Sequence, residues 1–177
     1  HTALRRQRQM CIRDSYTVMP DRIEAGTFLI AAAITRSTVS LFPCQTNHLN
    51  AVIKKLELCG CRFENSKQVL RIIPNQTLSS VDITTGPFPD FPTDLQAPFM
   101  ALMTTANGTS KIKETVFENR MHHVKELNFM GANITLKDNI ATIIGVKNLH
   151  GSVVTGSDLR ASAALAIAGL SANGKTI

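Results

Sequence analysis

The chain repeats its own hydrophobic pattern, and this repetition limits the fold more than any other feature. When Gly60 is aligned with Gly131, Ile53 corresponds to Val124, and the apolar positions coincide on both sides of the glycines. An internal repeat of this kind indicates supersecondary units that stack on one another and share a core. We therefore expect an architecture of related units, with the second unit built like the first.

Each unit contains two kinds of predicted helix. Asp21–Thr35, Thr93–Asn107 and Asp158–Leu170 each begin at or beside an acidic residue and are apolar nearly all round, so we expect them to be buried on every side. Their many small side chains would let the three helices pack closely. Thr46–Cys59 and Glu118–Met130 carry one apolar stripe, which is typical of a helix that covers a sheet.

Short β-rich segments complete each unit and give the order β-α-β-α-β-β, an α/β (α+β) class. The predicted strands after the amphipathic helices are Arg62–Glu64 and Val69–Ile73, then Asn133–Leu136 and Ile140–Val146, joined by turns at Asn65-Ser66 and Asp138-Asn139. We expect repeat 1 at about 16–74, repeat 2 at about 80–146 and the start of repeat 3 at about 152–177. The third unit stops early, so we expect the chain to be a fragment of a longer protein.

The charge distribution argues against a nucleic-acid partner. The formal net charge is +6, but residues 1–15 hold four arginines against one aspartate, and the remaining 15 basic and 12 acidic residues are scattered. Arg5–Ser15 can be back-translated to a common sequencing-library adapter. We interpret residues 1–15 as adapter read-through rather than native sequence; a genuine basic arm is the alternative.

Composition also bears on membranes and metals. No apolar run approaches the length of a membrane span, and Phe28–Ile34 is far too short. Cys44, Cys59 and Cys61 lack zinc-ligand spacing, so we expect small buried thiols in a reducing, cytoplasmic compartment. We expect no metal and no cofactor.

The segment Gly86–Ala97 reads GPFPDFPTDLQA and holds the best candidate for catalysis. Its three prolines favour an extended backbone, and Thr93 and Asp94 are typical caps of the apolar helix that follows. A carboxylate held by a stiff loop suits a general base that takes a proton from a hydroxyl. An ordinary helix cap is the alternative.

Four ordered blocks resemble the enolpyruvyl transferase family, over about Tyr16–Ile177. They are Met19–Thr27 (MPDRIEAGT), Phe91–Ala97 (FPTDLQA), Glu114–Arg120 (ETVFENR) and Gly156–Ser162 (GSDLRAS). The resemblance implies an inside-out α/β barrel domain of three such repeats, with helices inside and sheets outside. About two and a half of the three repeats would be present.

The blocks are most similar to the amino-sugar branch of this family. The resemblance implies transfer of the enolpyruvyl group from phosphoenolpyruvate to the 3-hydroxyl of UDP-N-acetylglucosamine, with release of phosphate, at the first committed step of bacterial peptidoglycan precursor synthesis. The shikimate-pathway branch and a non-catalytic nucleotide-sugar-binding paralogue are the alternatives. A second domain of the same chain would supply the general acid, so we expect these residues alone to be inactive.

The resemblance also implies roles for single residues. Asp94 would bind and deprotonate the substrate hydroxyl, the backbone of Val116 would contact the nucleotide sugar, and Phe117 would lie against the uracil. The alternative for Val116 and Phe117 is two strand residues that fill a core. His122 and His123 are interpreted as surface or hydrogen-bonded core groups.

Three further residues are substrate-binding candidates. Asp158 and Arg160 would lie at the mouth of the active cleft and orient charged groups near the enolpyruvyl site. Arg120 would clamp a phosphate or carboxylate, or form a structural ion pair with Glu118 or Glu24.

Overall fold

The computed structural model describes Ser15 and residues 17–177, so the interpretation of residues 1–14 lies outside the described part. The elements of the first unit are α2 (Arg22–Ile34), β1 (Val39–Leu41), the 3-10 helix η1 (Thr46–His48), α3 (Asn50–Leu58), β2 (Cys61–Ser66) and β3 (Val69–Pro74). Among the described residues no strand precedes α2, so this unit shows the predicted order without its first strand.

The second unit has the complete predicted order. Its elements are β4 (Ile83–Thr84), the 3-10 helix η2 (Thr93–Leu95), α4 (Gln96–Met103), β5 (Thr109–Lys113), α5 (His123–Phe129), β6 (Asn133–Lys137) and β7 (Ile140–Ile144). Helix α6 (Leu159–Ser171) follows and corresponds to α2 and α4.

Each unit forms its own sheet. Strands β1, β3 and β2 make an antiparallel sheet in the order β1-β3-β2, and the second sheet has the order β4-β5-β7-β6, with β4 parallel to β5. Phe63 faces Ile72 in the first sheet, and Ile134 faces Ile143 in the second. These pairs are equivalent in the alignment that places Gly60 on Gly131, so the predicted repeat holds down to strand register.

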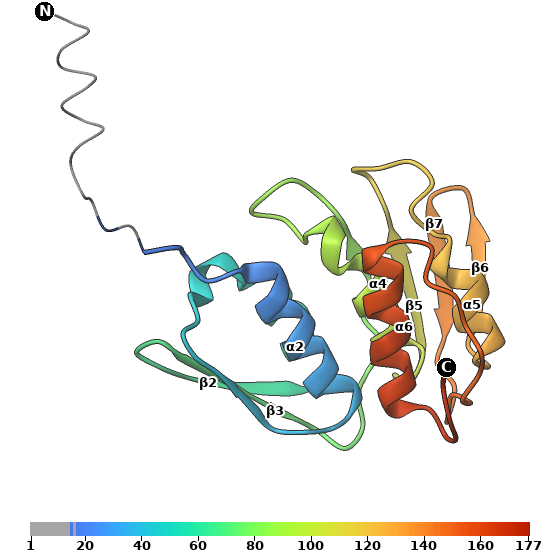
Figure 1. Cartoon of the computed structure of the whole chain (residues 1–177), viewed down its shortest axis with the longest axis horizontal. Helices are drawn as coiled ribbons and strands as arrows, with labels where there is room; N and C mark the ends of the chain where they lie inside the picture. The colour runs from blue at the N-terminus through green and yellow to red at the C-terminus, as the bar shows by residue number, and fades with distance from the viewer. Residues whose placement is uncertain (1–14, 16) are drawn as a thin grey trace, which may run out of the picture.

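The three apolar helices α2, α4 and α6 contact one another, and the two sheets lie outside them (Figure 1). All residues of α4 are buried, as predicted. The prediction is wrong for the other two helices, because Phe28 of α2 is 53% exposed and Leu159 of α6 is 84% exposed. Close packing depends on small residues: a Cβ added to Gly26 of α2 would lie 2.3 Å from Cδ1 of Leu95.

Several predicted boundaries are wrong. The helix expected at Thr46–Cys59 is divided into η1 and α3, and the helix expected to reach Asn107 ends with α4 at Met103. Helix α5 begins at His123 instead of Glu118, because the residues before it form a loop. The first hairpin turns at Lys67-Gln68 instead of Asn65-Ser66, because Ser66 still pairs with Val69 in the ladder. The second turn, at Asp138-Asn139, is where it was predicted.

The proline segment is a compact turn, not an extended strand. The N–H of Asp90 donates to the carbonyl of Pro87 at 2.9 Å, and the N–H of Gly86 donates to the carbonyl of Phe91 at 3.0 Å. The loop therefore closes on itself before η2 begins. These hydrogen bonds fix the start of η2, the element that carries Asp94.

Cys44, Cys59 and Cys61 are buried and free, as predicted. Burial raises the pKa of Cys59 to about 12 and that of Cys61 to about 11, so these thiols are weak nucleophiles at neutral pH. Within residues 15 and 17–177, no helix has both the length and the apolar character that a bilayer crossing requires.

Candidate active site

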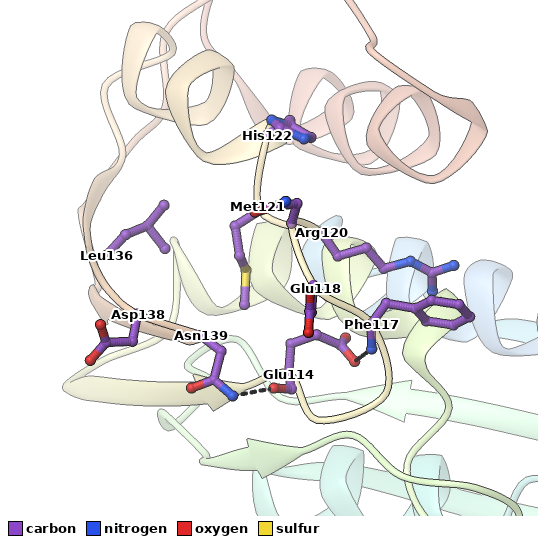
Figure 2. Close-up of a pocket in the computed structure, with 10 residues that line it drawn as sticks. Glu114, Phe117, Glu118, Arg120, Met121, His122, Leu136, Asp138 and Asn139 are labelled. Carbon is purple, nitrogen blue, oxygen red and sulfur yellow. Dashed lines mark hydrogen bonds between the residues drawn. The ribbon is translucent and has the colours of Figure 1, made fainter.

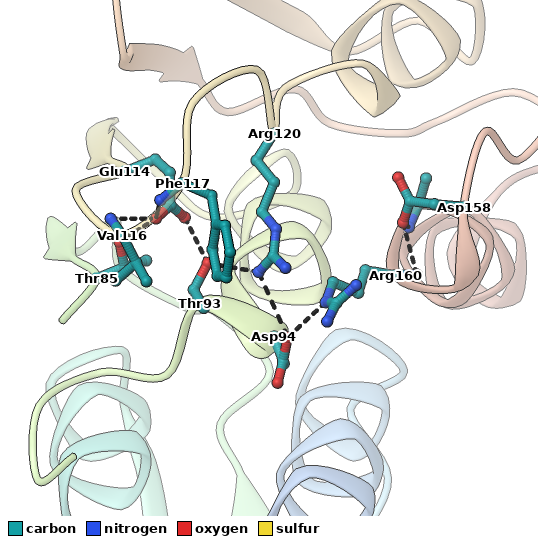
Figure 3. Close-up of polar contacts among 10 residues, drawn as sticks. Thr85, Thr93, Asp94, Glu114, Val116, Phe117, Arg120, Asp158 and Arg160 are labelled. Atoms are coloured by element: carbon teal, nitrogen blue, oxygen red, sulfur yellow. Dashed lines mark hydrogen bonds and ion pairs between the residues drawn. The ribbon is translucent and has the colours of Figure 1, made fainter. Parts of the chain in front are cut away.

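Asp94 lies in η2 and does not cap a helix. The cap position of η2 is Pro92, and α4 begins at Gln96 without a side-chain cap, so the prediction that Asp94 is a capping group is wrong. Its Oδ1 instead accepts hydrogen bonds from Nε of Arg160 and, at 3.4 Å, from Nη1 of Arg120 (Figure 3). The side chain is 36% exposed, so this carboxylate is held by two guanidinium groups and still reaches the surface.

Arg120 belongs to the loop before α5 and reaches Asp94 from there. Its Nη1 donates to Oγ1 of Thr93 at 2.7 Å, and its guanidinium stacks 3.9 Å from the centre of the Phe117 ring. The hypothesis of an ion pair with Glu118 or Glu24 is wrong for the described residues, since the carboxylate partner of Arg120 is Asp94. A guanidinium held by a ring and a hydroxyl has little freedom to move away from that carboxylate.

Asp158 caps α6, as its position predicted. Its Oδ1 accepts from the N–H of Arg160 at 2.8 Å and from the N–H of Ala161 at 3.0 Å. These backbone hydrogen bonds, that of Ala161 first, lower the pKa of Asp158. The cap fixes the first turn of α6, and from that turn Arg160 reaches across to Asp94 (Figure 3).

Val116 and Phe117 are not strand residues of a core. Strand β5 ends at Lys113, and the side chains follow in a loop with 38% of Val116 and 50% of Phe117 exposed. The N–H of Val116 donates to Oε1 of Glu114 at 2.8 Å, so the backbone group with which Val116 can meet a ligand is its carbonyl. Phe117 presents an aromatic face beside the Arg120 guanidinium.

Glu114 is a site residue that the sequence analysis did not single out. It is only 2% exposed, although it carries a carboxylate. The alternation of β5 contained the signal: Ser110 and Ile112 are buried, and Glu114 continues the same inward face. An acidic residue at an inward strand position needs polar partners, and here they come from the site.

A pocket of about 540 Å³ adjoins these residues (Figure 2). It lies between the loop that follows β5 and the β6–β7 hairpin, and it is lined by Glu114, Phe117, Glu118, Asn119, Arg120, Met121, His122, Leu136, Asp138 and Asn139. Asp94, Asp158 and Arg160 are not among its lining residues. The loop before α5 thus lines the pocket and also contacts Asp94 through Arg120.

His122 is exposed and His123 is buried, as expected, but His123 is not hydrogen-bonded through Nε2. Burial lowers the pKa of His123 to about 4, so this imidazole is neutral at neutral pH. The part of the chain that the structure describes contains no cluster of three or more His, Cys, Asp or Glu residues arranged to hold a metal ion.

The geometry and the fold define a class of protein. A family model described as EPSP synthase (3-phosphoshikimate 1-carboxyvinyltransferase) matches residues 7–177. The chain belongs to this family of enolpyruvyl transferases. The fold agrees: the enolpyruvyl transferase NikO from Streptomyces tendae superposes with a TM-score of 0.79 at 25% identity, over 88% of this chain and 37% of that one.

Curated relatives point to one branch of the family. UDP-N-acetylglucosamine 1-carboxyvinyltransferase 2 of Prochlorococcus marinus is 63% identical over 163 residues, which are 92% of this chain and 38% of the relative. A UDP-N-acetylglucosamine 1-carboxyvinyltransferase of Parasynechococcus marenigrum is 57% identical over 92% of this chain and 37% of its own length. EPSP synthase from Acinetobacter baumannii shares the fold, with a TM-score of 0.67 at 18% identity over 91% of this chain and 39% of that one. The chain thus spans somewhat more than a third of the length of these relatives.

Proposed function

We propose that these residues belong to an enzyme that transfers the enolpyruvyl group of phosphoenolpyruvate to the 3-hydroxyl of UDP-N-acetylglucosamine and releases phosphate. The observation that carries the proposal is the Asp94 carboxylate, which is free of helix capping, held by Arg120 and Arg160 and open to the surface. The names of the relatives support the amino sugar as the acceptor. Such an enzyme would catalyse the first committed step in the synthesis of peptidoglycan precursors.

In the proposed reaction Asp94 accepts the proton of the 3-hydroxyl. The hydroxyl oxygen then forms a bond to C2 of phosphoenolpyruvate while C3 takes up a proton from a general acid, which gives a tetrahedral intermediate. C3 of this intermediate next loses a proton to a base as the C2–O bond to phosphate breaks, so the C2=C3 double bond is restored and phosphate leaves. A fixed carboxylate within reach of the hydroxyl is what general base catalysis requires. Neither Arg120 nor Arg160 can accept a proton, so in this cluster only Asp94 can act as the base.

We assign recognition of the nucleotide sugar to the loop before α5. The exposed ring of Phe117 offers a flat apolar surface to the uracil, and the carbonyl of Val116 offers an acceptor to the sugar nucleotide. Asp158 acts through the helix that it caps, because both of its capping bonds lie at the start of α6. Arg160 and Arg120 supply positive charge close to the reacting groups.

The proposed partners are the two substrates and a second domain that supplies the general acid. We also propose a cytoplasmic site of action, which the free and buried thiols of Cys44, Cys59 and Cys61 support because disulfides are rare in reducing compartments.

Phosphate release by the complete enzyme tests the proposal. Phosphoenolpyruvate is supplied with either UDP-N-acetylglucosamine or shikimate 3-phosphate. We expect release with the amino sugar, and a fall of roughly 10²- to 10⁴-fold in kcat for Asp94→Asn, which keeps the shape of the side chain but removes the base. Asp90→Asn is the matched control, since Asp90 is an exposed acidic residue in the neighbouring turn.

Each other result has a definite meaning. Release only with shikimate 3-phosphate would assign the enzyme to the shikimate branch. Release with neither acceptor, together with calorimetric binding of UDP-N-acetylglucosamine, would favour a binding protein. Full activity of Asp94→Asn would remove Asp94 from the mechanism.

A further inference from the structure

We propose that Glu114 is a positioning residue that links the loop before α5 (residues 114–122) to the proposed base Asp94. This inference rests on the proposed function and deepens it, because it assigns the residue that sets the geometry between acceptor binding and proton transfer. Glu114 touches neither substrate in this proposal; it acts through Thr93, Val116 and Phe117.

The first argument is the cost of burying a carboxylate. Glu114 is 2% exposed, and no Lys, Arg or His lies within ion-pair distance of it among the described residues. An isolated buried carboxylate is strongly unfavourable unless hydrogen-bond donors surround it. Its oxygens accept hydrogen bonds from four donors. Three of them lie at 2.8 Å: Oγ1 of Thr85, Oγ1 of Thr93 and N of Val116; the fourth, N of Phe117, lies at 3.2 Å. An apolar side chain would fill this buried position equally well, so packing alone does not explain a carboxylate here. The four hydrogen bonds indicate that Glu114 holds these donors in place.

The two oxygens divide this role. Oε1 accepts from the hydroxyl of Thr85 and from the N–H groups of Val116 and Phe117, so it anchors the loop. Oε2 accepts from the hydroxyl of Thr93, which immediately precedes Asp94. One carboxylate therefore bonds to the loop with one oxygen and to the segment of the base with the other (Figure 3).

The Thr93 hydroxyl transmits this arrangement to Asp94. Because the hydroxyl proton is donated to Oε2 of Glu114, the lone pairs of Oγ1 are left for Nη1 of Arg120 at 2.7 Å. The same Nη1 contacts Oδ1 of Asp94 at 3.4 Å. Glu114, Thr93, Arg120 and Asp94 thus form a continuous series of hydrogen bonds. Thr93 donates to Glu114, and Nη1 of Arg120 donates both to Thr93 and to Asp94.

The backbone of Glu114 is fixed as well. Its N–H donates to the carbonyl of Asn139 at 3.0 Å, and its carbonyl accepts from Nδ2 of Asn139 at 2.7 Å (Figure 2). The β6–β7 hairpin thereby holds Glu114 on both sides, so the carboxylate is a rigid reference point for the loop.

The test uses the complete enzyme with Glu114→Gln, Thr93→Val and the double variant. The glutamine keeps an oxygen at the Oε1 position, where three donors select it, and places an NH₂ group opposite the Thr93 hydroxyl. We expect kcat to fall roughly tenfold in each single variant, the cost of one hydrogen bond to a charged group, with KM for UDP-N-acetylglucosamine changed by less than about threefold. The double variant should equal the single ones within about twofold, because both changes break the same series.

Glu114→Ala removes the hydrogen bonds of both carboxylate oxygens. It should also raise KM for the nucleotide sugar by roughly tenfold or more, because the loop loses the bonds that fix it to Oε1. Ser110→Ala is the matched control: Ser110 is also buried, and its Oγ accepts from the N–H of Val81 away from the site. It should lower the melting temperature without changing kcat or KM. If Glu114→Gln fails to fold, Thr93→Val still tests the hydrogen bonds that lead from Glu114 through Thr93 to Asp94.

Unchanged kcat in Glu114→Gln and Thr93→Val, or fully additive losses in the double variant, would overturn the inference while wild-type turnover upholds the proposed function. No turnover of UDP-N-acetylglucosamine by the wild-type enzyme would instead overturn the proposed function, and the inference with it.

Discussion

At the scale of single residues, the site is defined by the contacts of one carboxylate. Asp94 has a guanidinium on each side, from the loop before α5 and from the first turn of α6. These contacts determine where the carboxylate points, and the exposed part of the side chain is left for a ligand. The chemistry that we propose depends on this orientation as much as on the presence of an acid.

Replacing Arg160 by lysine should expose this dependence. The ammonium keeps the charge but lacks the planar Nε donor that binds Oδ1 of Asp94. We expect kcat/KM for phosphate release to fall by roughly 10- to 100-fold in Arg160→Lys, as one charge-assisted hydrogen bond is lost. Arg71→Lys is the control, because Arg71 forms an exposed pair with Glu64, 49% and 61% accessible, and should leave the rate unchanged. Equal rates in both variants would show that charge alone suffices at Arg160.

At the scale of the elements, the inner helices bring the site together through close contacts. Helix α2 approaches η2 where Gly26 meets Leu95, the residue directly after Asp94. Helix α6 packs on α4 and carries Arg160 toward the same point. Small residues in the helices are therefore part of how Asp94 is placed.

Two helical glycines allow a matched test of this packing. A Cβ at Gly26 would lie 2.3 Å from the buried Leu95, whereas a Cβ at Gly169 of α6 would meet nothing closer than 3.4 Å. We expect Gly169→Ala to be neutral or to raise the free energy of unfolding by up to about 1 kcal/mol, through better helix propensity. Gly26→Ala should lower it by about 1–2 kcal/mol, because overpacking exceeds the same gain.

Urea unfolding of the 177-residue chain, followed by circular dichroism, measures both changes. Equal shifts of the two midpoints would contradict the proposed tight contact between α2 and η2. A reduced kcat of Gly26→Ala in the complete enzyme would show in addition that this contact places Asp94.

At the scale of the whole molecule, the buried His123 makes stability depend on pH. Its pKa is lowered from 6.5 to about 4 by burial, so the unfolded chain binds a proton at pH values where the folded chain does not. The associated stability is present above the unfolded pKa and is lost as the pH falls from 6.5 toward 4. Asp158 contributes in a lower range, because its pKa is lowered from 3.8.

The expected result is a steeper loss of stability in the wild-type chain than in His123→Gln. Between pH 7 and pH 4 the free energy of unfolding should fall by up to about 3 kcal/mol more in the wild type, at 1.36 kcal/mol for each unit of pKa shift. Asn47→Gln is the control, because Asn47 is exposed and carries no ionisable group, so the change should leave the slope unaltered. Parallel curves for the wild type and His123→Gln would show that His123 is accessible to protons in the folded state.

Patterns that act over a few residues were sufficient to predict most of the fold. Asp21 and Asp158 cap α2 and α6 as expected, and the alignment of Gly60 with Gly131 anticipates the strand register. Caps, periodicity and turns depend on neighbouring residues, so a sequence displays them directly. The start of α5 was predicted at Glu118 but lies at His123. Local preferences are weak at a helix end, so the contacts of the preceding loop determine where the helix begins.

The sequence by itself therefore determined the repeated unit, the inner helices and the candidacy of Asp94. Only the tertiary structure decided what Asp94 contacts: Arg160 is 66 residues away in the chain, and it arrives because α6 packs on α4. The same is true of Glu114, whose donors come from Thr85 just after β4, from η2 and from its own loop. An ion pair or a buried carboxylate takes its partners from segments that meet only after the core has formed, and no local pattern records that meeting.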